Sequence, residues 1–293
     1  MLSPSIMLIL LTLIWGLTFP ATKAALTATT PMQFLALRFG IAMVIILPMT
    51  LIKARRGELR RAEGESKVWI WGIGIGVLLL AGYILQAVGM KYTTASRSGF
   101  FTGLLTIFTP IFASLFRTSK TSWATWMGVP VAIVGVYLLA DPSLGGMNLG
   151  DWLTVICAVV FALQMVTLEA SSGKLGGIEA VAGRLWVAQI AVAGIGSVIG
   201  ALIEGAEWHV APVGWWGIAY TAIFGSIIAT WAQTRYQPKV PAGHAALIFS
   251  LEPVFAAMFA AMLLGDTWTQ RGLLGAGFII MAMITSSLGS RKK

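Results

Sequence analysis

Tyr92-Thr-Thr-Ala-Ser-Arg-Ser-Gly-Phe-Phe-Thr-Gly-Leu-Leu-Thr-Ile-Phe-Thr-Pro-Ile-Phe112 is the stretch around which the chain is organised. It is apolar enough to lie in a membrane. Yet Ser98, Thr102 and Thr106 recur at every fourth position, so their hydroxyls share one helix face, with Thr109 close by. Pro110 follows and lacks the backbone N–H that the helix ladder uses. The stretch therefore predicts a membrane helix with a polar face and an interruption.

A weaker copy of this pattern returns at 239–255, where Pro253 follows an apolar run. Interrupted membrane helices at corresponding places of two repeats are typical of transporters, which bind substrate between the repeats. The repetition predicts a transport pathway, with Pro110 and Pro253 as candidate gating residues. The alternative is a pair of kinked packing helices whose hydroxyls bond to carbonyls of their own helix.

The composition indicates a membrane protein. Of the 293 residues, 57% are hydrophobic and 11% are charged, and the mean hydropathy is +0.85. Soluble domains carry about 25% charged residues. In a soluble protein the net charge of +9 would suggest nucleic acid as a partner; here it reflects basic loops on one side of a membrane. The single cysteine, Cys157, allows no disulfide framework within the chain.

A transmembrane helix needs about 20 mostly apolar residues. Ten such runs are present, near 5–26, 31–52, 68–90, 95–116, 122–140, 151–171, 177–203, 214–236, 240–264 and 268–288. The predicted fold class is therefore all-α, a polytopic membrane protein with ten transmembrane helices. The long connection Lys53–Lys67 is predicted to be a charged surface loop.

The distribution of basic residues predicts the orientation. If both termini are cytoplasmic, the outside receives Lys23, Lys91, Arg97 and Arg271, and Arg38 and Arg184 lie within spans. The other 14 of the 20 basic residues then fall inside. Cytoplasmic loops carry the excess of Lys and Arg, so the asymmetry favours this arrangement.

The second half of the chain repeats the first. A shift of 146 positions places Trp15-Gly16 on Phe161-Ala162 and Arg38 on Arg184. Further matches follow at offsets of 145 and 147: Trp71-Gly72 with Trp216-Gly217, and Tyr83 and Gln86 with Thr230 and Gln233. The predicted repeats, 1–145 and 146–293, hold five helices each. Because five is odd, the second repeat is inverted, and a binding site is expected near the membrane midplane between them.

The halves resemble the two EamA-type domains of the drug/metabolite transporter superfamily over essentially the whole chain. The matching pieces are Ile14-Trp15-Gly16, Leu37-Arg38-Phe39, Tyr92–Ser96 leading to Pro110, Ser250-Leu-Glu-Pro-Val-Phe255, Leu264-Gly265-Asp266 and Gly275-Ala-Gly277. This resemblance implies an inner-membrane carrier of small metabolites. Many carriers of this family export amino acids. It extends to the branch that exports aromatic amino acids, although no single motif identifies that branch.

Three charged residues are predicted to lie within spans. Arg38 and Arg184 cannot remain unpaired in lipid, so they either bind a substrate carboxylate or bond to protein groups as structural residues. The recurrence of the arginine in both halves favours the structural role. Glu252 precedes Pro253 near the middle of a span, and a buried carboxylate there either pairs or takes up a proton. It is a candidate for ammonium binding or proton coupling, or for satisfying backbone groups freed by the proline.

Aromatic and amide side chains deep in the spans predict an amphipathic cavity. The candidate substrate-binding residues are Trp15, Tyr83, Gln86, Phe101, Thr102, Phe161, Gln164, Trp186, Gln233 and Ser250. For any one of them, packing against lipid or protein is the alternative. The sequence holds no metal-binding cluster, nucleophile–base pair or P-loop, so no cofactor, metal or enzymatic activity is expected.

The sequence thus predicts a secondary transporter in the bacterial inner membrane that works by alternating access. It would export small amphipathic metabolites, foremost amino acids with aromatic or other apolar side chains. A drug or nucleoside/sugar carrier is the alternative within the superfamily, and a membrane scaffold or membrane enzyme is the alternative outside it. The expected partners are a small-molecule substrate and the lipid bilayer, with no nucleic acid. Proton coupling and a monomeric or homodimeric state remain open.

Overall fold

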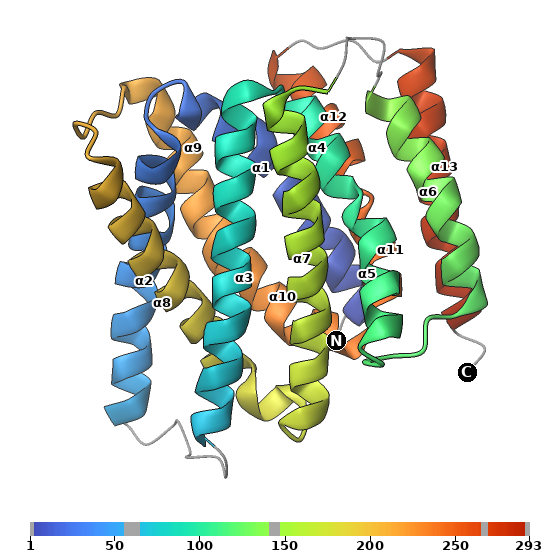
Figure 1. The fold of residues 1–293 in the computed structure, drawn as a ribbon, viewed down its shortest axis with the longest axis horizontal. Helices are drawn as coiled ribbons and strands as arrows, with labels where there is room; N and C mark the ends of the chain where they lie inside the picture. The colour runs from blue at the N-terminus through green and yellow to red at the C-terminus, as the bar shows by residue number, and fades with distance from the viewer. Residues whose placement is uncertain (1–2, 56–64, 141–146, 265–268, 291–293) are drawn as a thin grey trace.

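The computed structural model describes residues 3–55, 65–140, 147–264 and 269–290 as a bundle of helices (Figure 1). Among these residues, eight helices are long and apolar enough to cross a membrane, and two shorter apolar helices run over 123–138 and 270–286. The predicted all-α fold class, a polytopic membrane protein, is confirmed.

The helix bounds agree with the predicted spans to within a few residues. The first half contains α1 (Pro4–Leu26), α2 (Pro31–Arg55), α3 (Glu65–Tyr92), α4 (Ala95–Gly103), α5 (Leu105–Leu115) and α6 (Trp123–Ala140). The second contains α7 (Leu149–Lys174), α8 (Ile178–Glu204), α9 (Trp215–Tyr220), a π-helix (Thr221–Ile228), α10 (Ala229–Tyr236), α11 (Ala242–Phe249), α12 (Glu252–Leu264) and α13 (Gln270–Ser290), with short 3-10 turns at Pro212–Gly214 and Gln237–Lys239.

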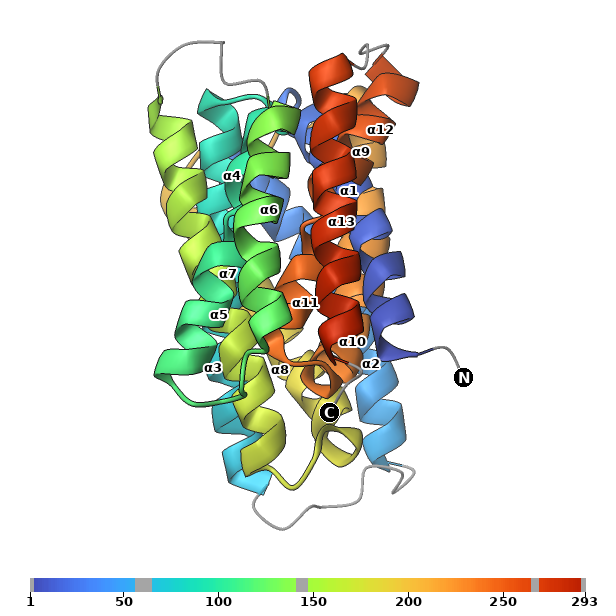
Figure 2. The same ribbon diagram turned by 90° about the vertical axis from the view of Figure 1, so that its right-hand side faces the viewer.

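The two halves run in opposite directions through the bundle. In Figure 1, α1 rises from the end of the bundle that also holds the end of α13, whereas α7 starts at the other end and descends. We call the end where α1 begins the N end. Helix α2 packs on α8, and α6 packs along α13, so in these pairs each helix meets its own counterpart (Figure 2). This pairing is what a twofold axis in the membrane plane produces.

The predicted interruption of the first polar-faced helix is real, but its predicted position at Pro110 is wrong. Helix α4 ends at Gly103 and α5 begins at Leu105, whereas Pro110 lies inside α5. At the joint, the Leu104 N–H donates to the Phe101 carbonyl at 3.2 Å. The Thr106 hydroxyl donates to the Gly103 carbonyl at 2.7 Å. A tightened turn and a side-chain hydroxyl thus replace the regular ladder before the proline is reached.

The second interruption lies where it was predicted. Helix α11 ends at Phe249, and α12 begins at Glu252 with Pro253 in its first turn, where a missing N–H costs no helical bond. Leu251 lies 147 positions after Leu104. The two helices therefore break at corresponding places, although their prolines do not correspond.

The π-helix explains why the repeat offset changes along the chain. The offset rises from 145 at Trp71/Trp216 to 147 at Tyr83/Thr230, so the second half carries two additional residues in this interval. The first half has an unbroken α-helix here, whereas the second half has Thr221–Ile228 in the wider π form. A π segment absorbs extra residues while keeping the helix continuous. It restores the register before α10 reaches the centre of the bundle.

Apart from Arg38 and Arg184, which lie within spans, the described basic residues lie at the two ends. Those at the N end are Lys53, Arg55, Lys67, Arg117, Lys120, Lys174, Arg235 and Lys239, and those at the opposite end are Lys23, Lys91, Arg97 and Arg271. Positions 56–64 of the predicted charged loop, and Gly265 and Asp266 of the family-like motif, lie outside the described residues.

Candidate functional site

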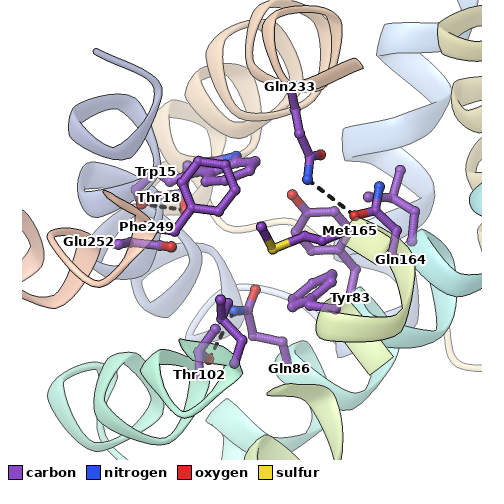
Figure 3. Close-up of a pocket in the computed structure, with 13 residues that line it drawn as sticks. Trp15, Thr18, Tyr83, Gln86, Thr102, Gln164, Met165, Gln233, Phe249 and Glu252 are labelled. Carbon is purple, nitrogen blue, oxygen red and sulfur yellow. Dashed lines mark hydrogen bonds between the residues drawn. The ribbon is translucent and has the colours of Figure 1, made fainter. Parts of the chain in front are cut away.

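A cavity of about 40 Å³ lies between the two halves (Figure 3). Its walls are buried: every lining residue except Trp15 and Phe161 is less than a tenth exposed. The lining residues are Trp15, Thr18, Leu79, Tyr83, Gln86, Thr102, Leu105, Phe161, Gln164, Met165, Gln233, Phe249 and Glu252.

The two halves contribute equivalent elements to this cavity. Helices α1, α3 and the α4–α5 pair line it from the first half, and α7, α10 and the α11–α12 pair line it from the second. Many of the side chains correspond as well, at offsets of 146 or 147: Trp15 with Phe161, Thr18 with Gln164, Gln86 with Gln233, Thr102 with Phe249, and Leu105 with Glu252. The last pair breaks the symmetry, because a carboxylate stands opposite a leucine.

Edge-on aromatic contacts build the walls. Trp15 and Phe249 meet with ring centroids 5.1 Å apart at 74°, and Tyr83 and Phe161 meet at 5.3 Å and 75°. Each pair joins one half of the chain to the other. Such T-shaped pairs are favourable beyond the area that they bury. The cavity thus has stable apolar sides that can contact a flat or aliphatic group.

Arg38 lies directly behind this wall and does not line the cavity. Its guanidinium carbon is 4.1 Å from the Tyr83 ring centroid, and its Nε donates to the Ser226 hydroxyl at 2.8 Å. Ser226 belongs to the π-helix. The guanidinium thus connects α2 to α3 and to the second half.

Arg184 recurs at the same offset but has different surroundings. Its Nη1 donates to the Ala180 carbonyl of its own helix at 3.4 Å, and it does not line the cavity. Equal positions in the two repeats therefore carry different contacts.

A chain of amides extends from the cavity into the second half. Gln233 donates to Gln164 at 3.1 Å, Gln164 donates to Gln189 at 3.4 Å, and Gln189 donates to Thr234 at 3.0 Å. All of these side chains are at most 3% exposed. In Figure 3 the Gln233 and Gln164 amides meet at one side of the cavity. The amide N–H groups of Gln233, Gln164 and Gln189 therefore all donate to other protein groups.

Glu252 is the one charged residue among those that line the cavity. It is 9% exposed and begins α12 at the second helix joint. Its carboxylate has no hydrogen bond or ion pair within residues 3–55, 65–140, 147–264 and 269–290. A buried carboxylate in this position can bind a cation or a proton.

The structure brings together eight of the residues singled out from the sequence: Trp15, Tyr83, Gln86, Thr102, Phe161, Gln164, Gln233 and Glu252. Three others do not reach the cavity. Phe101 meets Phe100 edge-on, Trp186 packs among α2, α3 and α8, and the Ser250 hydroxyl donates to the Leu247 carbonyl. Four hydroxyl side chains were predicted to share one helix face: Ser98, Thr102, Thr106 and Thr109. All four are buried, but among them only Thr102 lines the cavity.

The sequence-based selection missed five lining residues: Thr18, Leu79, Leu105, Met165 and Phe249. The repeat offset was a signal that could have found three of them. Thr18, Leu105 and Phe249 are the counterparts of Gln164, Glu252 and Thr102.

Carboxylates at the two ends of α7 hold the bundle together above and below the cavity. Near the opposite end, Asp151 accepts hydrogen bonds from Thr93 at 2.7 Å and from Arg97 Nε at 3.2 Å. Near the N end, Glu169 accepts from the Thr118 hydroxyl at 2.8 Å and from the Ala242 N–H at 3.1 Å. The two carboxylates are 18 positions apart, about 27 Å along the helix.

Each carboxylate holds the start of one interrupted helix. Thr93 and Arg97 flank the beginning of α4, and Ala242 is the first residue of α11. The two helices are counterparts in the repeats. At the opposite end, Lys23 of α1 also donates to the Met90 and Thr93 carbonyls. We call the Asp151 and Glu169 contacts the two latches of α7.

Comparisons with known proteins agree with this architecture. A model of the EamA-like transporter family matches residues 2–140 and again 148–288. An uncharacterized transporter of Archaeoglobus fulgidus is 31% identical over 283 residues, covering 96% of this chain and 84% of the relative. The uncharacterized inner membrane transporter YedA of Escherichia coli is 24% identical over 280 residues, covering 94% and 88%. Neither name states a substrate.

A solved crystal structure has the same fold, with a TM-score of 0.73 and 17% identity; the match covers 99% of this chain and 97% of the other. The family match extends over both halves of the chain, and the relatives match along nearly its whole length. The chain therefore belongs to the EamA-like transporter family of the drug/metabolite transporter superfamily and is a multi-pass membrane transporter.

Proposed function

We propose that the protein is a secondary carrier that exports small amphipathic metabolites, and that amino acids with aromatic or other apolar side chains are its substrates. The observation that carries this proposal is the buried cavity between the repeats, which has apolar walls and few polar groups. An apolar side chain of the substrate would lie against the Trp15–Phe249 and Tyr83–Phe161 pairs. Its polar end would meet Glu252, Gln86 and Gln233.

Flux in reconstituted vesicles tests this proposal and ranks its rivals. Vesicles preloaded with unlabelled phenylalanine or leucine should take up the labelled amino acid by exchange. A quaternary ammonium drug, a nucleoside and a sugar are tested in the same way, because a drug or nucleoside/sugar carrier would prefer one of these. A membrane scaffold or membrane enzyme would exchange none of them.

Alternating access would use the two five-helix units, 1–145 and 146–293, as the moving parts. We infer that opening at the opposite end breaks the Asp151 latch and opening at the N end breaks the Glu169 latch. Two hinges are available at Leu104 and Leu251, where the counterpart helices are interrupted.

Pro110 and Pro253 are proposed to act as gating residues because each packs against the other interrupted helix. A Cβ built on Gly103 would lie 3.5 Å from the Pro253 Cγ, so this proline contacts the first hinge. A Cβ built on Gly243 would lie 3.3 Å from the Pro110 Cβ, so the other proline contacts the start of α11. Pro110→Ala is expected to slow exchange several-fold while the folded yield stays close to that of the wild type. Unchanged exchange per folded molecule would make the proline a packing residue only.

We further propose that the protein lies in the bacterial inner membrane with both termini in the cytoplasm. Lys120 and Glu207 are exposed at the N end and at the opposite end, respectively. In a Cys157→Ser background, a membrane-impermeant thiol reagent added to intact cells should label Glu207→Cys and leave Lys120→Cys unlabelled. The reverse labelling would overturn the orientation. Positions 60, 146 and 292, which the same experiment can use, lie outside the described residues.

Proton coupling through Glu252 is part of the proposal, and the protein is proposed to work as a monomer or homodimer. Sedimentation of the purified protein in detergent measures that oligomeric state. The coupling is tested by the first experiment of the Discussion.

A further inference from the structure

We propose that the cavity recognises the protonated amine of its substrate, and that the substrate carboxylate is dispensable for binding. The acceptors are the Gln233 side-chain oxygen and the Glu252 carboxylate, and Gln189 fixes the direction in which Gln233 faces. This inference rests on the proposed function for its physiological meaning, because it specifies which part of the transported molecule the site holds.

The direction of the amide chain begins at a backbone carbonyl. Gln189 Nε2 lies 3.2 Å from the Leu185 carbonyl oxygen, which can only accept a hydrogen bond. The same Nε2 lies 3.0 Å from the Thr234 hydroxyl, which already donates its proton to the Thr230 carbonyl at 2.7 Å. Both neighbours therefore require a donor, so the Gln189 amide has one allowed orientation.

That orientation passes from one amide to the next. Since Gln189 turns its Nε2 to the backbone, its Oε1 faces Gln164 and accepts from the Gln164 Nε2 at 3.4 Å. Gln164 Oε1 then accepts from the Gln233 Nε2 at 3.1 Å. A reversed Gln233 would place two oxygens against each other. The chain therefore ends at the cavity with an oxygen, Gln233 Oε1.

This terminal oxygen has no partner in the described part of the chain. Gln233 is 3% exposed, and its Oε1 is a buried atom without a hydrogen bond. An unpaired buried acceptor is unfavourable, and a ligand donor would remove that penalty. Gln233 lines the cavity, so a group carrying N–H or O–H that enters beside it can satisfy this acceptor.

The charge of the cavity selects among such groups. Glu252 supplies a negative charge, and no Lys, Arg or His is among the thirteen lining residues. The Trp15 indole N–H is a buried donor without a partner, but it is neutral. The Arg38 guanidinium is separated from the cavity by the Tyr83 ring on which it stacks. An ammonium group therefore finds a carboxylate and an oriented amide oxygen, whereas a carboxylate finds no cation in the wall.

Equilibrium dialysis of the purified full chain tests this preference with two probes that share a phenylethyl group. Phenethylamine carries the ammonium without the carboxylate, and 3-phenylpropionate carries the carboxylate without the ammonium. At pH 7 phenethylamine is expected to bind at least tenfold more tightly, a difference of about 1.4 kcal/mol. Equal binding, or tighter binding of 3-phenylpropionate, would overturn the proposal.

Three variants assign the preference to the amide chain. Gln233→Leu should weaken phenethylamine binding about tenfold and leave 3-phenylpropionate unchanged. Gln189→Leu, which lies outside the cavity lining, should reduce the preference for the amine because Gln164 and Gln233 lose their fixed direction. Gln237→Leu is the matched control, because Gln237 is also buried, lies just after α10 and does not line the cavity. This variant should bind both probes as the wild type does. Equal effects of Gln233→Leu and Gln237→Leu would count against the proposal.

The inference and the proposed function fail in different ways. If phenylalanine is exchanged and N-acetylphenylalanine inhibits it as well as phenylalanine methyl ester does, the carrier function stands and amine recognition is wrong. If phenylalanine is not exchanged but phenethylamine binds through Gln233, amine recognition stands and the proposed amino-acid substrate is wrong.

Discussion

Glu252→Gln is expected to abolish the accumulation of substrate that a pH gradient drives, while exchange at equal concentrations continues. Glu252 is the one acidic residue of the cavity lining, and glutamine keeps its shape and hydrogen-bonding capacity without the titration. A buried carboxylate without a cationic partner can bind either a proton or a cationic substrate group, so the two compete for it. The other titratable groups nearby are Tyr83 across the cavity, Cys157 on α7, and Arg38 behind Tyr83.

The direction of substrate accumulation follows from the exchange of a proton for a substrate molecule. If Glu252 carries a proton in one direction and substrate in the other, wild-type vesicles should accumulate labelled phenylalanine on the more acidic side. Glu252→Gln vesicles should equilibrate it without accumulation. Glu179→Gln is the control, because Glu179 is an exposed carboxylate paired with Arg235 and Lys239 far from the cavity lining. Accumulation retained by Glu252→Gln would remove the carboxylate from the coupling. If wild-type flux does not depend on the pH gradient, the protein is a facilitator.

Asp151→Asn is expected to open the cavity toward the opposite end about tenfold more often, and Glu169→Gln to open it toward the N end. Hydrogen bonds to a charged group contribute about 1.5–3 kcal/mol, and 1.4 kcal/mol is a tenfold change in population. Asp151 is fully buried against Thr93 and Arg97, so neutralising it weakens the closed state selectively. Asparagine retains an acceptor for Thr93, which limits the damage to the start of α7.

A single cysteine in the cavity measures these populations. Thr102→Cys in a Cys157→Ser background places the thiol in the cavity wall. In intact cells, an impermeant reagent should label it about tenfold faster when Asp151→Asn is added and more slowly when Glu169→Gln is added. Inverted vesicles should give the opposite order. If both variants change labelling in the same direction from both sides, the contacts stabilise the fold and do not act as latches.

The fold was largely predictable from the sequence because hydropathy and repetition report on it directly. Each span is a run of apolar residues, and lipid requires a helix there, so the bounds could be placed to within a few residues. The repetition also reports on the π-helix. The change of offset between Trp71/Trp216 and Tyr83/Thr230 marks the two residues that the π-helix absorbs.

The site was only partly predictable because it depends on side-chain partners from different helices. Pro110 was a strong local signal, yet the helix breaks at Leu104, where the Thr106 hydroxyl takes the Gly103 carbonyl. Phe101 and Trp186 look like cavity residues in the sequence, but their helices turn them toward other side chains. The role of Gln189 could not be read from the sequence, because its importance lies in contacts with Leu185, Gln164 and Thr234.

The measurement that most directly tests transport through this cavity is phenylalanine exchange by Leu105→Trp in reconstituted vesicles. Leu105 lines the cavity at 5% exposure, and an indole at this position would fill the space that the substrate needs. Leu115→Trp is the matched control, since Leu115 ends the same helix and is 67% exposed on the outside of the bundle. We predict that Leu115→Trp exchanges phenylalanine as the wild type does. Leu105→Trp, folded in equal yield, should fall to the level of protein-free vesicles. Exchange by Leu105→Trp at the wild-type rate would contradict the account.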